Sequence, residues 1–338
     1  MSATLATTTP ASTSRPSADE MNGYRKGCTA LMPNVPTSYD YVPHLSAGIV
    51  FCVLFGLSMA GHIVQGARKR QWTSYVCATG ALTELIGWGG RTWSSQCPYN
   101  DSAFLMQITT LIMAPTFFSA AAYVVLGTLI KLVGRASSAL SPVTYLVVFC
   151  TCDGVSLVVQ AVGGALASIA QKNGTSTKDG TNIMVAGIVF QMAAMTVFVF
   201  FLVDFLRRVW RMGGRSSLPQ GAALVLPAMV FSVVTIYIRS IYRTIELLQG
   251  WRGYLIVHEK YFIALDAAMM VLATAVYNVL DPAILLPSSK KGQDGEAQIE
   301  PSPSAGESEI PLEEAKDSKQ DKAEDDQGSR QSGSAHGS

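Results

Sequence analysis

The amino-acid sequence predicts an all-α membrane protein: a bundle of seven transmembrane helices with its amino terminus outside and its carboxyl terminus in the cytosol. Hydrophobic residues make up 49% of the 338 residues and charged residues only 14%, against about a quarter in typical soluble domains. The apolar residues gather in blocks of roughly 20 or more, the length that a helix needs to cross a hydrocarbon core about 30 Å thick. The loops between these blocks differ in their content of Lys and Arg.

Seven apolar segments are long enough to cross a membrane. The second is the weakest, because Glu84 and Arg91 interrupt it. The third and sixth contain Pro115 and Pro227, which a bundle tolerates where neighbouring helices satisfy the freed backbone carbonyl. In chain order, the predicted spans are 43–65, 74–93, 104–130, 143–169, 182–207, 220–247 and 260–284.

The orientation follows from Lys and Arg, which are more frequent in short cytosolic loops. One side carries eleven: Arg68, Lys69, Arg70, Lys131, Arg135, Arg207, Arg208, Arg211, Arg215, Lys290 and Lys291. The other side carries five: Arg25, Lys26, Lys172, Lys178 and Arg252. We therefore expect the amino terminus to lie outside or in a lumen.

The two ends of the chain differ in composition from the middle. Residues 1–40 begin with a stretch rich in Ser, Thr and Pro that contains no apolar core of a signal peptide, so we expect the first span to direct insertion. Residues 287–338 are polar and rich in charge. Segments with so little apolar surface cannot bury enough of it to compensate for the conformational entropy that the chain loses on folding. We expect a disordered extracellular tail at 1–40, a membrane domain at 41–286 and a disordered cytosolic tail at 287–338.

Two cysteines and two asparagines fall in the predicted outer segments. Cys28 and Cys97 lie in an oxidising compartment under this orientation, so a disulfide between them is expected, with two unrelated free thiols as the alternative. Asn173 begins a glycosylation sequon between the fourth and fifth spans. A second sequon begins at Asn100, close to the third span, where a glycan is less expected.

Ionisable residues within spans cost about 2.5–3.5 kcal/mol each on insertion scales and are functional candidates by default. Their spacing places several on inward-facing stripes, such as Arg239, Arg243 and Glu246, which are four and then three residues apart. The candidates for a ligand-binding site or translocation pathway are Glu84, Arg91, Asp153, Gln160, Arg239, Arg243, Glu246, Glu259 and Asp266.

Two interpretations of these charges remain open. They pair as structural links, Arg239 or Arg243 with Asp266 and Arg91 with Glu84 or Glu246, or they also line a hydrated ligand pocket. Their five acids exceed their three bases, which favours a cationic head group such as an amine.

The sequence also excludes several classes of protein. It has no phosphate-binding Gly-rich loop with Lys, no His-Glu-x-x-His, no Gly-x-Ser-x-Gly and no metal-like cluster of His and Cys, so we expect no enzyme, nucleotide, cofactor or metal. The sequence also contains no basic stripe with interleaved aromatic residues, so it gives no indication that the protein binds nucleic acid. His44, His62 and His258 lie near predicted span ends, where we expect solvated or interfacial imidazoles.

Several stretches resemble a known family. They are TELIGWGGR (83–91), APTFFSAAAYVVLG (114–127), CDGVSLVVQAVGG (152–164), GIVFQMAAMTVFVF (187–200) and IRSIYRTIE with the following Glu, Tyr and Leu-Asp (238–266). Together they are similar to the fungal Rta-like, lipid-translocating exporter family of seven-span proteins. Trp88 stands where the family pattern has Tyr, and Asp281-Pro282 where His-Pro is more usual.

The resemblance implies a membrane protein that transports or flips amphiphilic lipids, such as sphingoid long-chain bases, and gives resistance to toxic amphiphiles. Its partners would be membrane lipids or other amphiphiles, in the plasma membrane or an endomembrane. The alternative is a seven-span receptor or regulator of lipid asymmetry that transports nothing itself.

Overall fold

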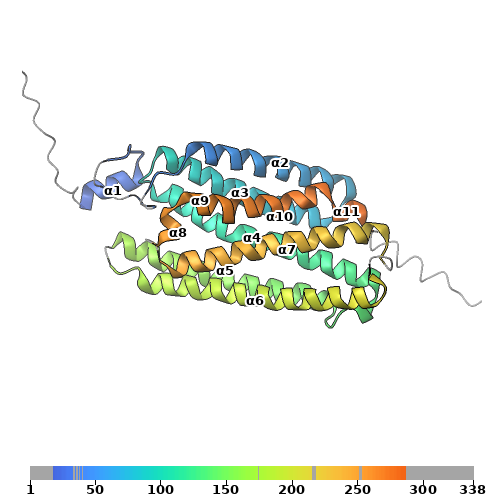
Figure 1. The fold of residues 1–338 in the computed structure, drawn as a ribbon. Helices are drawn as coiled ribbons and strands as arrows, with labels where there is room; N and C mark the ends of the chain where they lie inside the picture. Colours follow the sequence, from blue (N-terminus) through green and yellow to red (C-terminus); the bar gives the residue numbers. More distant parts are fainter. Residues whose placement is uncertain are drawn as a thin grey trace, which may run out of the picture. The chain divides into compact units, whose positions relative to one another are not determined.

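The computed structural model describes residues 18–32, 35, 37, 39, 41–173, 175–214, 218–250 and 253–286, and these form an all-helical bundle (Figure 1). Its long helices are α2 (Leu45–Lys69), α3 (Trp72–Gln96), α4 (Asp101–Val133), α5 (Pro142–Lys172), α6 (Lys178–Arg211) and α7 (Gln220–Leu248). The last rod, a helical segment of similar length, consists of four consecutive helices: α9 (Glu259–Phe262), the π-helix η3 (Ile263–Ala267), α10 (Ala268–Val279) and α11 (Pro282–Leu285). Short helices are α1 (Ala18–Lys26), the 3-10 turn η1 (Arg135–Ser137) and α8 (Tyr254–Val257).

Within the described ranges, six helical segments are long and apolar enough to cross a membrane. They are α2, α4, α5, α6, α7 and the composite segment Glu259–Leu285. Helix α3 has 25 residues but does not belong to this set, because its sequence includes many Ser, Thr and Gly residues together with Glu84 and Arg91. Apart from residues 43 and 44, the seven spans expected from the sequence lie within α3 and these six segments.

Successive long helices run in opposite directions, so the bundle has two ends (Figure 1). The start of α2 and the end of α3 lie at one end, here called the α1 end, and the opposite end holds α11. Helix α4 contacts α3, α5 and α7 and has the largest buried share of the six apolar segments. The core is strongly aromatic, with Trp88, Phe118, Tyr123 and Phe198 each at most 1% exposed.

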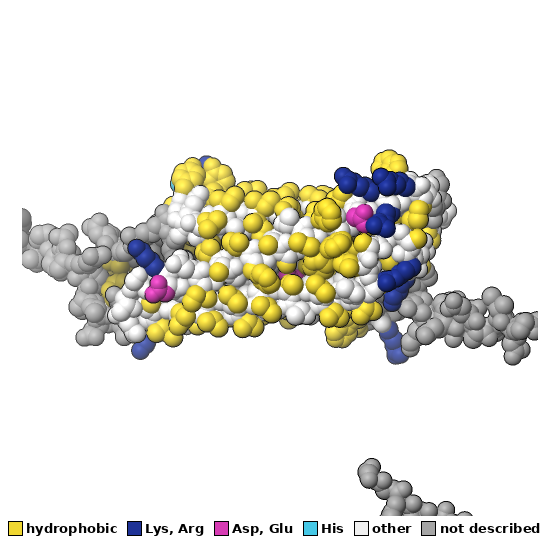
Figure 2. All heavy atoms as spheres, turned by 90° about the horizontal axis from the view of Figure 1, so that it is seen from below, with side chains coloured by type: hydrophobic (Ala, Val, Ile, Leu, Met, Phe, Trp, Pro, Cys, Tyr) yellow, Lys and Arg dark blue, Asp and Glu magenta, His cyan; other side chains and the backbone are white. Residues whose placement is uncertain are grey.

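The outside of the bundle carries apolar side chains, which is unusual for a surface in contact with water. Leu57, Val158 and Phe200 are each more than 60% exposed, and they lie on three different helices. Figure 2 shows this apolar surface along the bundle, with Lys and Arg gathered mainly at the α11 end. The arrangement fits helices that are surrounded by lipid along their length and end in polar surroundings.

Part of the expected extracellular tail is structured. Residues Ala18–Lys26 form α1, Cys28 is bonded to Cys97, and Tyr39 is only 6% exposed. These described residues of 1–40 therefore contact the bundle through Cys28 and Tyr39. Residues 1–17 and the expected tail 287–338 lie outside the described residues.

Candidate functional site

A buried network of charges joins α7 to η3. The Nε atoms of Arg239 and Arg243 lie 2.9 Å and 2.8 Å from the same Asp266 oxygen, Oδ1. Arg243 also donates from Nη1 to Glu246 Oε2 at 2.8 Å, and the Tyr242 hydroxyl donates to Glu246 Oε1 at 2.9 Å. Two carboxylates and two guanidinium groups are therefore held together, with Asp266 fully buried at their centre.

Local backbone geometry explains how these side chains meet. Arg239, Arg243 and Glu246 are four and three residues apart on α7, so they share one face of that helix. Asp266 lies in the π-helix η3, and one-turn π-helices inside α-helices occur frequently at functional sites. The wider π-turn changes the direction of side chains between Glu259 and α10, and Asp266 faces α7.

A second charged group lies nearer the α1 end. Arg91 Nη2 donates to Glu259 Oε1 at 2.9 Å and to the Tyr41 hydroxyl at 2.6 Å. Glu259 also accepts a bond from the His44 backbone amide at 3.2 Å and contacts the His44 ring nitrogen Nδ1. The Phe262 ring lies between the two charged groups, 4.5 Å from the Arg91 guanidinium and 5.0 Å from that of Arg243.

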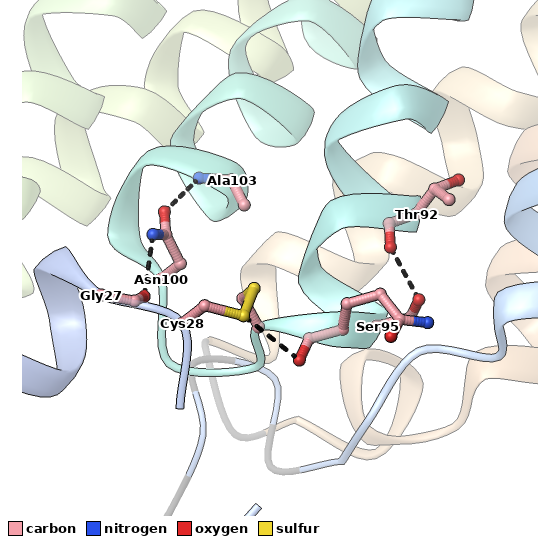
Figure 3. The surroundings of a disulfide bond; sticks show 8 residues. Gly27, Cys28, Thr92, Ser95, Asn100 and Ala103 are labelled. Atoms are coloured by element: carbon pink, nitrogen blue, oxygen red, sulfur yellow. Dashed lines mark hydrogen bonds between the residues drawn. A yellow bond between two sulfur atoms is a disulfide. The ribbon is translucent and has the colours of Figure 1, made fainter. Parts of the chain in front are cut away.

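The segment before α2 covers this group. The Tyr39 hydroxyl donates to Gln107 Oε1 at 2.5 Å, and burial raises the pKa of Tyr39 to about 12, so the phenol stays a proton donor. Nearby, Cys28 and Cys97 form a disulfide with Cα atoms 4.6 Å apart (Figure 3). Sequence reasoning missed Tyr39 and Tyr41, because isolated tyrosines in a short loop show no helical periodicity.

A small cavity of about 30 Å³ lies among α4, α5, α6 and α7. Such a volume holds a water molecule, since a single water needs about 10–15 Å³ measured in this way. The Asp153 carboxylate lines it and accepts a bond from the Tyr123 hydroxyl at 3.1 Å. The remaining polar lining comes from Ser119, Gln160, Gln191, Arg239, Ser240 and Arg243.

The sequence brings α5 and α6 close together beside this cavity. A Cβ atom on Gly163 would collide with the backbone of Met184, and one on Gly180 with the backbone of Ala167. Gly187 similarly leaves room for the Gln160 side chain, whose Nε2 donates to Ser156 Oγ at 2.5 Å and to Gln191 Oε1 at 3.1 Å. Small residues thus let the two backbones approach and point the amides toward the cavity.

Several buried polar atoms near these groups have no hydrogen-bond partner within the described ranges. Both carboxylate oxygens of Glu84 are among them, although this side chain is 0% exposed. The others include Trp88 Nε1, Arg243 Nη2, Asp266 Oδ2 and Gln160 Oε1. Unpartnered buried polar atoms are rare in folded proteins and call for an explanation such as water, an ion or a functional role.

The structure sorts the nine candidate residues into four places. Arg239, Arg243, Glu246 and Asp266 form the α7–η3 network, and Arg91 and Glu259 form the group at the α1 end. Asp153 and Gln160 line the cavity together with Arg239 and Arg243. Glu84 stands apart from all hydrogen-bonded groups within the described residues.

Some expected pairs are different in the structure. Asp266 binds both Arg239 and Arg243 rather than one of them. Arg91 binds Glu259 rather than Glu84 or Glu246. Glu84 lies seven residues before Arg91 on α3, about 10 Å along the axis, while Glu246 is already bound by Arg243.

Other expected positions also become clear. His62 is 1% exposed and lies 3.1 Å from Thr274 Oγ1, so it is a buried imidazole and not the solvated one that was expected. Asn173 is exposed at the end of α5. Asn100 caps α4 by accepting a bond from the Ala103 amide, and its Nδ2 donates to Gly27 O at 3.1 Å (Figure 3). That geometry disfavours a glycan on Asn100.

Comparison with known proteins found a matching family model and several relatives. The family model described as RTA1 like protein matches residues 77–289. The sphingoid long-chain base transporter RSB1 of Saccharomyces cerevisiae (strain Lalvin EC1118 / Prise de mousse) is 35% identical over 275 residues, covering 71% of this chain and 72% of the relative. Protoporphyrin uptake protein 1 of the same species (strain ATCC 204508 / S288c) is 30% identical over 284 residues, covering 71% and 90%.

Protein RTA1 from that second strain is 26% identical over 273 residues, covering 73% of this chain and 85% of the relative. No solved structure matches the chain. The family groups the chain with transporter-like membrane proteins and not with a known enzyme family. With six candidate membrane spans and this match, the chain is a multi-pass membrane protein that belongs to the RTA1-like family.

Proposed function

We propose that this protein moves amphiphiles with a cationic head group, such as sphingoid long-chain bases, between the two leaflets of a membrane and so protects cells from toxic amphiphiles. The head group passes along the buried polar residues, while the hydrocarbon tail stays in lipid. The observation that carries the proposal is the Asp153 carboxylate, which lines a cavity inside an apolar bundle with one phenol as its hydrogen-bond partner in the described chain.

The charge balance supports a cationic head group. Arg91 is neutralised by Glu259, while Arg239 and Arg243 are neutralised by Asp266 and Glu246. Asp153 and Glu84 are left without a basic partner in the described residues. Of these two acids, Asp153 is the one that lines the cavity.

The cavity also supplies acceptors and donors that suit an amino alcohol. An ammonium group would donate to Asp153 and to Gln160 Oε1, which has no partner at present. Hydroxyl groups would bond to the Gln191 and Ser119 side chains. A volume of about 30 Å³ is too small for the whole head group, so passage requires the α5–α6 pair to move relative to α4 and α7.

We propose that seven helices span the membrane, with α3 crossing inside the bundle where its neighbours cover Glu84 and Arg91. The Lys and Arg side chains at the α11 end support a cytosolic location for that end. The amino-terminal segment then lies outside and the segment 287–338 lies in the cytosol. The plasma membrane is the proposed location.

The names of two relatives support movement of amphiphilic molecules, since one is called a sphingoid long-chain base transporter and the other a protoporphyrin uptake protein. The matched region, 77–289, includes Asp153, the cavity and the α7–η3 network.

The test is leaflet exchange in vesicles. Purified protein is reconstituted in liposomes, a fluorescent sphingoid base is added, and loss of its accessibility to an outside quencher is followed over time. Wild-type protein is expected to accelerate exchange over protein-free vesicles. Asp153→Asn is expected to lower the protein-dependent rate about tenfold or more, because a hydrogen bond to a charged group contributes roughly 1.5–3 kcal/mol.

Asp204→Asn is the matched control. Asp204 lies near the α11 end, is partly exposed and pairs with Arg208 on its own helix, so its loss is expected to leave exchange unchanged. Wild-type vesicles that exchange the base no faster than protein-free ones would reject transport and favour a receptor or a regulator. Equal rates for Asp153→Asn and wild type would reject the role of Asp153 alone.

A further inference from the structure

Glu84 has an environment that no other acid in the described residues shares. It lies in the middle of α3, is 0% exposed, and neither of its carboxylate oxygens has a hydrogen-bond partner. One turn further along α3, Trp88 Nε1 is also buried without a partner. An ionised carboxylate in such a place has lost its hydration, and only Trp88 and the through-space attraction of Arg239 and Arg243 oppose that loss.

The charged groups that face Glu84 do not neutralise it. Asp266 of η3 and Arg239 and Arg243 of α7 act on it through space, but both guanidinium groups are already bonded to Asp266. Among the titratable side chains on elements packed against α3, Cys52 is bonded to Thr92, His62 to Thr274 and Tyr123 to Asp153, and Asp281 before α11 accepts a bond from the Ala283 amide. Asp153 also lacks a basic partner, but it lines a water-sized cavity, whereas Glu84 does not. A buried acid with neither a basic partner nor such a cavity takes up a proton, because desolvation disfavours its charged form.

We propose that Glu84 is a proton-binding site that couples transport of the cationic amphiphile to a transmembrane proton gradient. This inference rests on the proposed function and adds its energy source. The Glu84 carboxyl takes up one proton from water on one side of the membrane and releases it to water on the other. One cationic head group moves in the opposite direction for each proton, so the exchange is electrically neutral.

The position of Glu84 explains how the proton would act on the transport pathway. Release of the proton leaves a second carboxylate beside Asp266, which competes for Arg239 and Arg243. Those two arginines also line the cavity that contains Asp153. Binding or loss of one proton therefore changes the hydrogen bonds at the cavity wall without any contact between Glu84 and the head group.

The experiment uses the full-length protein in vesicles and a fluorescent trimethylated sphingoid base. This probe keeps its positive charge at every pH, so it is not trapped passively by a pH gradient as a free amine is. With a difference of one pH unit, one-to-one exchange gives about tenfold accumulation of the probe on the acidic side. In Glu84→Gln, movement with and without the gradient is expected to become equal, while Asp204→Asn keeps the wild-type response.

Infrared difference spectroscopy provides a second readout that needs no transport. The carbonyl stretch of a protonated carboxylic acid is expected in wild-type protein, absent in Glu84→Gln and shifted in Glu84→Asp. It is also expected to disappear when the pH is raised. This measurement decides the inference if the trimethylated probe is not moved or if Glu84→Gln is not recovered from the membrane.

The outcomes separate this inference from the proposed function. Suppose that wild-type protein exchanges the fluorescent amine base, but a pH gradient does not change its movement of the trimethylated probe. That result would overturn proton coupling and leave the proposed transport function intact. A gradient response in Glu84→Gln equal to that of wild type would show that the proton binds elsewhere. Absence of a band that depends on Glu84 would likewise overturn the proposal.

Discussion

Asp266 holds the buried network together through one oxygen atom. Its Oδ1 lies 2.9 Å and 2.8 Å from two guanidinium nitrogens, while its Oδ2 has no partner within the described chain. Buried ion pairs of this kind do not by themselves indicate high stability, because desolvation offsets their attraction. Removing one member is nevertheless costly, since it leaves an uncompensated charge in a place that water does not reach.

Loss of Arg243 is expected to have the largest effect of any single residue in the network, because among the described residues only its side chain contacts both Asp266 and Glu246. Arg243→Ala leaves Glu246 with only the Tyr242 hydroxyl and is expected to lower the free energy of unfolding by about 3–5 kcal/mol. Thermal unfolding of the purified protein in detergent measures this effect. Adding Glu246→Gln to Arg243→Ala is expected to recover a large part of the loss, since it removes the unpaired charge. No recovery would show that packing, and not charge, dominates at this position.

Individual partners could be predicted only in part from the sequence. The four-and-three spacing of Arg239, Arg243 and Glu246 predicts a shared face, which the structure contains, because helical periodicity depends on local geometry alone. The partner of Arg91 depends on how α3 is rotated against the last rod, and on the loop that carries Tyr41. Neither feature leaves a periodic pattern, so the expected pairs with Glu84 and Glu246 were wrong.

At the scale of elements, the contact between α5 and α6 depends on glycines that face the partner backbone. Gly163 lies against Met184 and Gly180, whereas the neighbouring Gly164 has no atom within 4 Å of an added Cβ. The pair Gly163-Gly164 in the sequence favours a close approach of two backbones, but it does not distinguish the two glycines. The distinction depends on the rotation of α5, which places one glycine inside the contact and the other outside it.

This difference gives a matched test of the contact. Gly163→Ala is expected to lower the free energy of unfolding by about 1–3 kcal/mol, because the methyl group meets backbone that has no room to move. Gly164→Ala is expected to leave stability unchanged or raise it slightly, since Ala favours the helix over Gly. Unfolding midpoints of the two variants in detergent provide the measurement. Equal effects of both substitutions would mean that α5 is rotated differently against α6.

The π-helix η3 marks the limit of element prediction. The apolar length of 260–284 predicts a span there, and the composite helical segment Glu259–Leu285 agrees with it. The wider turn between Ile263 and Ala267 has no sequence pattern of its own, and this segment contacts α7. Asp266 lies within this turn and pairs with two arginines of α7.

At the scale of the whole molecule, the distribution of surface residues favours one direction across the membrane. Apolar side chains cover the length of the bundle, and Lys and Arg gather at the α11 end (Figure 2). Basic residues in short loops favour the cytosolic side, so the α1 end and the loop between α5 and α6 should face outward. The disulfide between Cys28 and Cys97 lies at that same end, where an oxidising compartment would maintain it.

A glycan on Asn173 tests this orientation directly. Asn173 is exposed at the end of α5, followed by Gly174 and Thr175, so it is expected to be glycosylated if the α1 end faces the lumen during synthesis. Removal of N-glycans should then increase the electrophoretic mobility of wild-type protein but not of Asn173→Gln or Thr175→Ala. Asn100→Gln should leave the mobility unchanged, because the amide of Asn100 is bonded to Gly27 O and only 7% of the residue is exposed.

An engineered sequon in the loop between α4 and α5 serves as the opposite control, since that loop lies at the α11 end. Glycosylation of the engineered sequon, with none on Asn173, would show that the bundle has the opposite orientation. Asp153, Glu84 and the covering tyrosines would then lie in the reverse order across the membrane.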